Sequence, residues 1–407
     1  MDENQTEAFP DVSGLPGTGL SGTGLSGTGL SGTGLSGTGR RGVLKGALTL
    51  GAVAGLLSGS PACAAATSSA TAGLTSRQLA GQRVIYSYPG LTVPAALLSA
   101  ISAGQAAGVI FFADNIASET QVAAAIRQLA AAARRSPVAA PLLLMTDQEG
   151  GEVRRLPGGP ALSQKQIGAA ADPDRAAGQA GTAAGRNLAG VGMNVNLAPV
   201  LDVYTEAGNF IDAYQRSYSS SVPVVTGCGA AFITAQQHAG VAATAKHFPG
   251  LGQAAAAQNT DTGPVTLPVP LASLRSRDEA PYPAAIAAGV ELVMASWAIY
   301  PALDARRPAG LSPAVISGEL RGRLGFRGVT ITDAIEAGAL APFGSYGQRA
   351  VLAAEAGMDL LLCSARDVSQ GQAVVTALTA ALGSGKLGAT AFDAAVRRVT
   401  ALRSSLH

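Results

Sequence analysis

The chain has 407 residues, of which 47% are hydrophobic and 13% charged, and its formal net charge is +2 at pH 7. This length accommodates one large domain or two small ones, and the composition predicts a sizeable buried core. Because this net charge is small, neither nucleic acid nor an acidic membrane surface is expected as a partner.

The first 73 residues have the composition of segments that precede a folded domain. Residues 15–39 repeat the unit Ser-Gly-Thr-Gly-Leu. Because such a tract buries too little apolar surface to offset its chain entropy, residues 1–39 are expected to be disordered. Residues 40–73 begin with paired arginines and continue with a short apolar stretch and small residues, which predicts a twin-arginine-type signal peptide and a short linker. An ordinary Sec leader is the alternative.

The apolar stretch of this leader is too short for a comfortable membrane span. We therefore expect a protein that is secreted or held in the cell envelope, with membrane attachment only if Cys63 carries a lipid.

From residue 74 onward, apolar runs alternate with segments rich in Ala, Gln and Arg, such as 121–135 and 175–190. Near-continuous apolar runs are typical of parallel strands covered on both faces, and the segments between them predict helices. The eight runs are Val84–Tyr88, Gly108–Ala113, Leu142–Asp147, Asn194–Val200, Ala243–His247, Leu292–Trp297, Val329–Asp333 and Asp359–Ser364. Eight β–α units predict a (β/α)8 TIM-type barrel, a single catalytic α/β domain over residues 74–407.

An open doubly wound sheet is the alternative fold. It requires a phosphate-binding glycine-rich turn after the first strand, and residues 88–92 lack the GxGxxG pattern of such a turn. The barrel is therefore favoured.

The chain has three cysteines and no CxxC pair, so a structural zinc site is not expected. Cys363 follows the apolar run 360–362, so Cys228 and Cys363 are expected as buried free thiols, with a disulfide between them as the alternative. The carboxylates are not spaced as a metal cage, and neither a metal nor an organic cofactor is expected.

Five of the apolar runs end in or are continued by polar residues, at the ends that a barrel brings to its C-terminal mouth. Barrel enzymes keep their chemistry at this mouth. A single loop charge is usually just solvated, whereas several carboxylates with a Lys-His pair and an arginine at one rim indicate a site. The candidates are Asp147, Arg155, Arg216, Lys246, His247, Trp297 and Asp333, with Asp202 in a supporting position.

These residues lie in motifs that resemble those of glycoside hydrolase family three, in its β-N-acetylhexosaminidase-like branch. The motifs read D-Q-E-G-G-E-V-R-R-L at 147–156, N-L-A-P-V-L-D-V at 196–203, R-S-Y at 216–218, K-H-F-P-G at 246–250 and L-G-F-R-G at 324–328, followed by T-D at 332–333. They occur in the family's order, and the resemblance spans about residues 80–400.

The resemblance implies a retaining exo-glycosidase that releases terminal β-linked N-acetylhexosamine, such as N-acetylglucosamine, through a covalent glycosyl-enzyme on Asp333. A helix cap is the alternative role for Asp333. The resemblance also implies that Asp147 accepts hydrogen bonds from the non-reducing sugar. Lys246, His247 and Arg216 would donate to other hydroxyls or to the N-acetyl region.

Two further positions have two interpretations each. Arg155 matches the family's pattern, either as a substrate contact or as a brace of its loop. Trp297 replaces a histidine common in relatives and either stacks on a sugar or packs in the protein.

The loop after K-H-F-P-G departs from the family's pattern. Relatives carry D-S-H there, with the histidine as acid/base, whereas residues 251–263 contain no histidine. Asp261 takes that position if residues 259–261 are laid over D-S-H with a two-residue insertion. A carboxylic acid needs a raised pKa for this role, which burial or the nearby Asp333 would supply. We expect Asp261 to be the acid/base; the alternative is a turn cap, with the donor elsewhere or absent.

The expected partner is a carbohydrate, such as a chitin or peptidoglycan fragment, and the protein is expected to be a monomer. A β-glucosidase or another β-glycosidase of the same family is an alternative function. A non-hydrolytic sugar-binding barrel that has lost its acid/base is a third, although such a protein has no need of Asp333.

Overall fold

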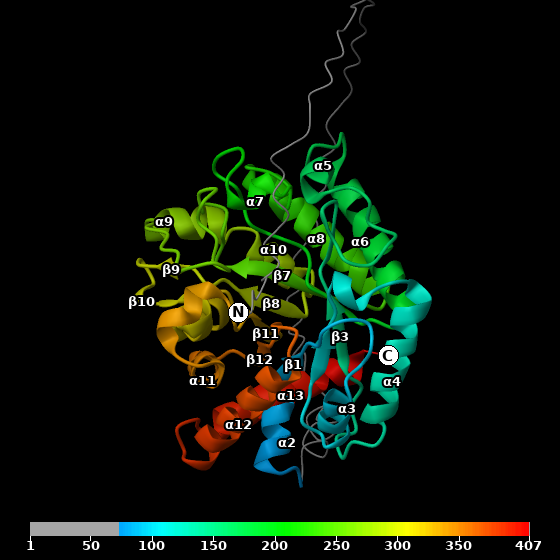
Figure 1. Cartoon of the computed structure of the whole chain (residues 1–407). Coiled ribbons are helices and arrows are strands. Elements are labelled where there is room, and N and C mark those ends of the chain that lie inside the picture. The colour runs from blue at the N-terminus through cyan, green and yellow to red at the C-terminus, as the bar shows by residue number, and fades with distance from the viewer. Residues whose placement is uncertain (1–72, 407) are drawn as a thin grey trace, which may run out of the picture. The chain divides into compact units, whose positions relative to one another are not determined.

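The computed structural model describes residues 73–406, in which eight parallel strands close into a barrel surrounded by helices (Figure 1). The strands follow one another around the barrel in the order β1-β12-β11-β8-β7-β6-β3-β2. Their bounds are β1 Val84–Tyr86, β2 Gly108–Ile110, β3 Leu143–Thr146, β6 Val195–Asn196, β7 Ala242–Phe248, β8 Leu292–Ala295, β11 Val329–Ala334 and β12 Leu360–Leu362. The (β/α)8 barrel is confirmed. The predicted segment 1–39 and residues 40–72 of the predicted segment 40–73 lie outside the described residues.

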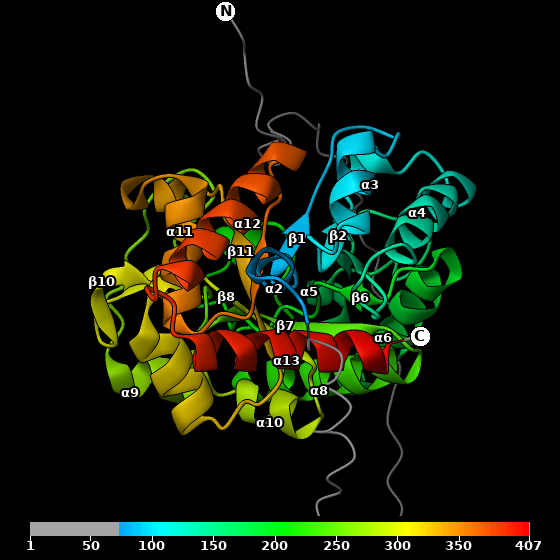
Figure 2. The same cartoon turned by 90° about the horizontal axis from the view of Figure 1, so that it is seen from below.

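Every predicted strand run overlaps one barrel strand, although β7 and β11 extend beyond their runs by a residue. The barrel strands are buried on both faces except at the end of β11. Their inward side chains, among them Ile85, Leu143 and Met294, form a core inside the barrel. Helix α13 (Ala389–Ser405) adds Val399 and Leu402 to this core. Figure 2 shows α13 crossing the end of the barrel. This helix closes the N-terminal end, so the opposite mouth is left for chemistry.

Helices lie between successive strands and cover the outside of the barrel. Two match the predicted segments closely, α4 (Glu119–Ala133) and α6 (Pro173–Val191). Their starts follow from capping, because the side chains of Ser118 and Asp172 accept backbone N–H bonds from the first turn. The other helices are α2 Ser76–Gly81, α3 Ala95–Ser102, α5 Gln164–Gly168, α7 Phe210–Ala213, α8 Val222–His238, α9 Leu271–Ser273, α10 Tyr282–Ala287, α11 Tyr346–Ala356 and α12 Val368–Gly383.

Shorter elements decorate the loops between the strands and helices. Two small antiparallel sheets pair β4 (Gln148–Gly150) with β5 (Val153–Arg154), and β9 (Ile299–Tyr300) with β10 (Asp304–Pro308). The remaining helical turns are η1 Ala113–Asn115, η2 Leu274–Asp278, η3 Ala309–Leu311, η4 Ala314–Arg323 and η5 Gly338–Phe343. The loop after β3 is thus folded as a hairpin, which fixes the residues that follow Asp147.

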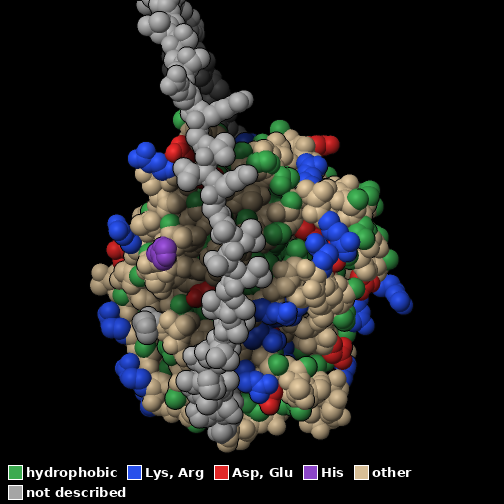
Figure 3. Space-filling view, turned by 180° about the vertical axis from the view of Figure 1, so that it is seen from behind, with side chains coloured by type: hydrophobic (Ala, Val, Ile, Leu, Met, Phe, Trp, Pro, Cys, Tyr) green, Lys and Arg blue, Asp and Glu red, His purple; other side chains and the backbone are tan. Residues whose placement is uncertain are grey.

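Cys228 and Cys363 are buried and free, as expected. Among residues 73–406, no helix is long and apolar enough to cross a membrane. On the face seen in Figure 3, Lys and Arg side chains lie in several separate groups, which agrees with the small net charge.

Candidate active site

Two carboxylates after β3 bind one lysine from β7. The Nζ of Lys246 lies 2.7 Å from Oδ1 of Asp147 and 2.8 Å from Oε1 of Glu149. Burial alone would lower the pKa of Lys246, but Asp147 and Glu149 outweigh it and raise that pKa above its ordinary value. The Asp147 side chain is 17% exposed and that of Glu149 only 1%, so Asp147 is the carboxylate available to a ligand.

Arg216 forms a bidentate ion pair with the same buried glutamate. Its Nη2 lies 2.8 Å from Oε1 of Glu149, and its Nε lies 3.0 Å from Oε2. Burial alone would raise the pKa of Glu149, but Arg216 and Lys246 outweigh it and lower that pKa to about 2. Glu149 therefore holds two cations at the mouth in fixed positions.

His247 is held by Asp202, the supporting carboxylate. Oδ2 of Asp202 lies 2.7 Å from Nδ1 of His247, and its Oδ1 accepts the backbone N–H of Leu251 at 2.7 Å. The other ring nitrogen, Nε2, lies 3.4 Å from Nη2 of Arg216. His247 is thereby oriented within the Lys246 and Arg216 cluster.

Two consecutive residues of β7 reach the same site because the strand is irregular there. The pairing of β7 with β8 shifts register between Ala245 and Phe248. A regular strand would send neighbouring side chains to opposite faces, and a register shift of this kind re-aims one of them. Lys246 and His247 therefore both contact Arg216 or its partner Glu149.

Asp333 lies near the end of β11, on the rim between β8 and β12. Its Oδ1 accepts the backbone N–H of Ala334 at 2.8 Å, and the residue is partly exposed. Trp297 is fully buried, and its indole N–H donates to the carbonyl oxygen of Ala334 at 2.8 Å. This placement favours packing over sugar stacking for Trp297, which braces the backbone beside Asp333.

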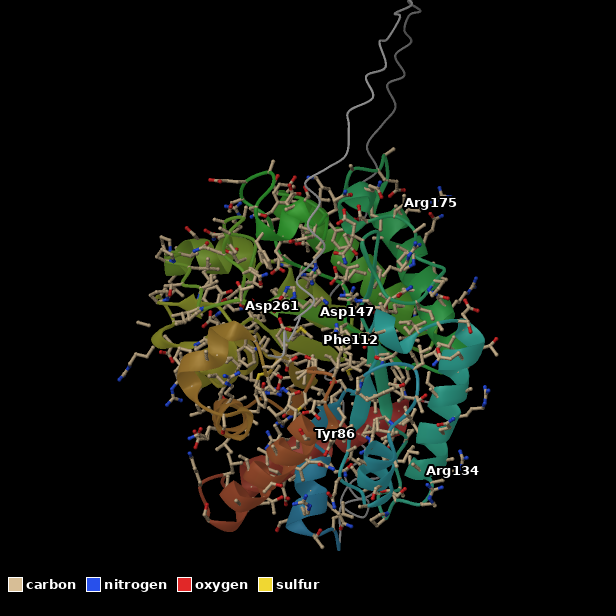
Figure 4. The ribbon with its side chains drawn as sticks, viewed as in Figure 1. Tyr86, Phe112, Arg134, Asp147, Arg175 and Asp261 are labelled. Carbon is tan, nitrogen blue, oxygen red and sulfur yellow. The ribbon has the colours of Figure 1, made fainter. Side chains whose placement is uncertain are left out.

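Asp261 lies in the loop between β7 and β8, at the rim of the mouth, and remains exposed. Figure 4 shows Asp147 and Asp261 over the centre of the barrel. Although the residue has exposed surface, the surrounding protein partly desolvates its carboxyl group. This desolvation and the charge of Asp333 raise the pKa of Asp261 to about 6, while Arg216 and His247 act in the opposite direction. The loop thus brings Asp261 within electrostatic reach of the residues at the strand ends.

Arg155 lies in the hairpin after β3. Its backbone N–H donates to the carbonyl oxygen of Asp147 at 3.3 Å, so it braces this loop. Its Nε is buried, and no hydrogen-bond acceptor among residues 73–406 reaches it.

Two glutamates of the site were missed from the sequence. Glu149 is inside a recognised motif, but its pairing with Lys246 and Arg216 joins segments far apart in the chain. Glu336 follows β11 and accepts from the Ser364 hydroxyl at 2.6 Å and from Gln370 Nε2 at 2.9 Å. It is also one of the charges that raise the pKa of Asp261. Only the position of Glu149 inside D-Q-E-G-G hinted at its role.

Replacing Glu149 with glutamine is expected to destabilise the protein by about 3–5 kcal/mol, because Arg216 loses its charged partner and buried Lys246 keeps only Asp147. The pKa of Glu149 falls from 4.5 to about 2 on folding, so its stabilisation is complete above about pH 4.5 and is lost as the pH falls towards 2. Urea unfolding at a series of pH values measures both effects.

The matched control is Glu152→Gln, an exposed neighbour in the same hairpin. It should change the free energy of unfolding by about 0.5 kcal/mol or less. Equal effects of the two substitutions would contradict a special role for Glu149.

Comparisons with known proteins agree with this fold. Residues 82–402 match the family model described as "Glycosyl hydrolase family 3 N terminal domain". An uncharacterized secreted glycosyl hydrolase of Arthroderma benhamiae is 50% identical over 329 residues, covering 80% of this chain and 93% of that protein. A beta-hexosaminidase of Stenotrophomonas maltophilia is 37% identical over 299 residues, covering 69% of this chain and 85% of that protein.

Among solved structures, a family 3 beta-N-acetylglucosaminidase from Paenibacillus superposes with a TM-score of 0.77 and 36% identity. The match covers 82% of this chain and 63% of that longer protein. Fold, site and relatives together define a glycoside hydrolase built on a (β/α)8 barrel. The chain belongs to glycosyl hydrolase family 3.

Proposed function

We propose that the protein is a retaining exo-β-N-acetylhexosaminidase that releases terminal N-acetylglucosamine from fragments of chitin or peptidoglycan. The observation that carries the proposal is the grouping of Asp333 and the protonatable Asp261 with the Asp147–Lys246–Arg216 cluster at one barrel mouth. The beta-hexosaminidase and beta-N-acetylglucosaminidase relatives support the choice of sugar.

In the first step, the Asp333 carboxylate attacks the anomeric carbon of the terminal sugar. The bond from that carbon to the leaving-group oxygen breaks, and the proton of Asp261 passes to this oxygen. The pKa of Asp261, about 6, is that of a carboxyl group able to donate a proton near neutral pH.

In the second step, water attacks the anomeric carbon of the glycosyl-enzyme. Asp261, now ionised, takes a proton from the water, and the ester bond to Asp333 breaks. Two displacements at one carbon return the β configuration to the released sugar.

The cluster beside these carboxylates binds the terminal sugar. Asp147 accepts hydrogen bonds from its hydroxyl groups, while Lys246 and Arg216 donate to other oxygens. Because Glu149 and Asp202 hold the donors in place before the sugar arrives, little side-chain freedom is lost on binding.

Export through a twin-arginine-type signal belongs to the same proposal. The secreted relative from Arthroderma benhamiae supports an extracellular or envelope location. The paired arginines of residues 40–41 supply the signal.

The test is a panel of p-nitrophenyl glycosides, followed by NMR of the first sugar released. The expected result is turnover of the N-acetyl-β-glucosaminide well above that of the β-glucoside, with the β-anomer appearing first. Preference for the glucoside would favour a β-glucosidase, and release of the α-anomer would contradict retention. Sugar binding without turnover of any glycoside would indicate a non-hydrolytic binding barrel.

A further inference from the structure

The loop that carries Asp261 is hydrogen-bonded to the segment that follows the Asp333 strand. The backbone N–H of Gly338 donates to the carbonyl oxygen of Asp261 at 2.8 Å, and that of Ala339 donates to Thr260 at 3.0 Å. Thr260 is buried although its neighbour Asp261 is exposed. The loop that carries Asp261 is therefore fixed to the segment that follows the strand of Asp333.

This contact leaves no room for a side chain at Gly338. A Cβ atom at this position would lie 2.5 Å from both the carbonyl carbon and oxygen of Thr262, and 2.9 Å from the carbonyl oxygen of Asp261. These are backbone atoms, so no rotation of a side chain relieves the overlap. The φ angle of Gly338 lies outside the left-handed region, so the restriction is one of space alone.

The loop itself is a braced turn. Oδ1 of Asn259 accepts the backbone N–H of Asp261 at 2.8 Å, and the carbonyl oxygen of Asn259 accepts the Thr262 hydroxyl at 3.0 Å. The Asn259 side chain thus forms an Asx-type turn that ties residues 259–262 together. Its position over the barrel mouth is consequently set by where it docks, which is the Gly338 contact.

We propose that Gly338 is a positioning residue that docks the Asp261 turn over the mouth and so sets the place of Asp261 relative to Asp333. The inference rests on the proposed function, in which Asp261 is the acid/base. It makes Gly338 necessary for proton donation, although this residue touches neither the sugar nor the reacting atoms.

The test is Gly338→Ala compared with Gly263→Ala. Gly263 lies in the same loop, its φ is ordinary, and an added Cβ would meet no atom within 4 Å. Gly338→Ala should lower kcat for natural disaccharides by about 10²-fold, the usual cost of misplacing a catalytic group by about 1 Å. The kcat/KM of a dinitrophenyl glycoside, which reports the first displacement and whose leaving group needs no proton, should fall by about threefold or less. Gly263→Ala should leave both unchanged.

Amide hydrogen exchange supplies a readout that is independent of activity. In Gly338→Ala the amides of residues 338 and 339 should exchange at least about tenfold faster, because the carbonyl acceptors of the loop have moved away. Unchanged exchange together with an unchanged dependence on the leaving group would overturn the docking role.

Failure of the proposed function gives a different pattern. If Asp261→Ala itself shows no dependence on the leaving group, the acid/base assignment is wrong, while the exchange measurement still reports whether Gly338 docks the loop. Should Gly338→Ala not fold, Asn259→Ala removes the acceptor of the Asp261 N–H without touching the barrel core. Asn259→Ala should produce the same selective loss of activity on substrates with poor leaving groups. If no such loss is seen, the proposal is refuted.

Discussion

Replacing Asp333 with asparagine is expected to lower kcat on N-acetyl-β-glucosaminides by about four orders of magnitude, equivalent to about 5 kcal/mol of transition-state stabilisation. Asparagine keeps the size of the side chain and an oxygen able to accept the Ala334 N–H, but it removes the nucleophilic charge. The dissociation constant for the product N-acetylglucosamine should change by about threefold or less, because Asp147, Lys246 and Arg216 are untouched.

Steady-state kinetics and calorimetric titration with the sugar measure these two quantities. Asp393→Asn, an exposed change on α13, serves as the control and should leave kcat unaltered. A parallel loss of binding and turnover in Asp333→Asn would indicate a disturbed mouth instead of a missing nucleophile.

Covalent trapping tests the same residue directly. A 2-deoxy-2-fluoro glycoside with a good leaving group should inactivate the wild-type enzyme and leave its sugar on Asp333, as peptide mass spectrometry would show. The fluoro sugar has no acetamido group, so labelling cannot arise from attack by the substrate's own amide. Failure to label Asp333, or labelling of another carboxylate, would overturn the nucleophile assignment.

The positions of Asp147, Lys246 and Asp333 followed from the sequence because barrel topology is a strong constraint. Parallel strands place their C-terminal ends at one mouth, so a polar residue after each apolar run must lie there. The structure brings these ends together through the register of neighbouring strands, β3 with β6 and β6 with β7.

The interactions between those ends did not follow from the sequence. Glu149 pairs with Lys246 and with Arg216, and Arg216 lies 67 residues further along the chain. Such pairing depends on side-chain directions that no local sequence pattern encodes. Trp297 is buried because Gly310 allows its ring to approach: a Cβ there would lie 2.5 Å from the ring. From the sequence alone, an aromatic residue at a strand end can therefore be interpreted either as a sugar-stacking or as a packing residue.

Loops are the least predictable part of the site for a further reason. The Asp261 turn has few apolar residues, so hydrophobic periodicity says nothing about where it docks. Its position depends on backbone contacts with Gly338 and Ala339. Glycine is needed at 338 only because the loop occupies the space that a side chain would fill, and the sequence does not show this.

Replacing Asp261 with alanine is expected to lower kcat/KM for chitobiose, whose leaving group must be protonated, by about 10²–10⁴-fold. The loss on dinitrophenyl N-acetyl-β-glucosaminide should be far smaller for the first displacement, since that leaving group departs as an anion. The second displacement then lacks its base, so the glycosyl-enzyme should accumulate. Dinitrophenol should then appear in an initial burst. Azide should restore turnover by attacking the anomeric carbon, with the carboxylate of Asp333 departing and a β-glycosyl azide forming.

The pKa of Asp261 also predicts how kcat/KM changes with pH. A general acid works in its protonated form, which for Asp261 is present below a pKa of about 6. In the wild-type enzyme, kcat/KM for chitobiose should therefore decline as the pH rises through about 6, since kcat/KM reports the free enzyme. Asp261→Ala should lose this decline while retaining any dependence that arises from other groups. An unchanged alkaline limb, or equal and small losses on both substrates, would mean that the proton comes from elsewhere and that Asp261 only shapes its turn.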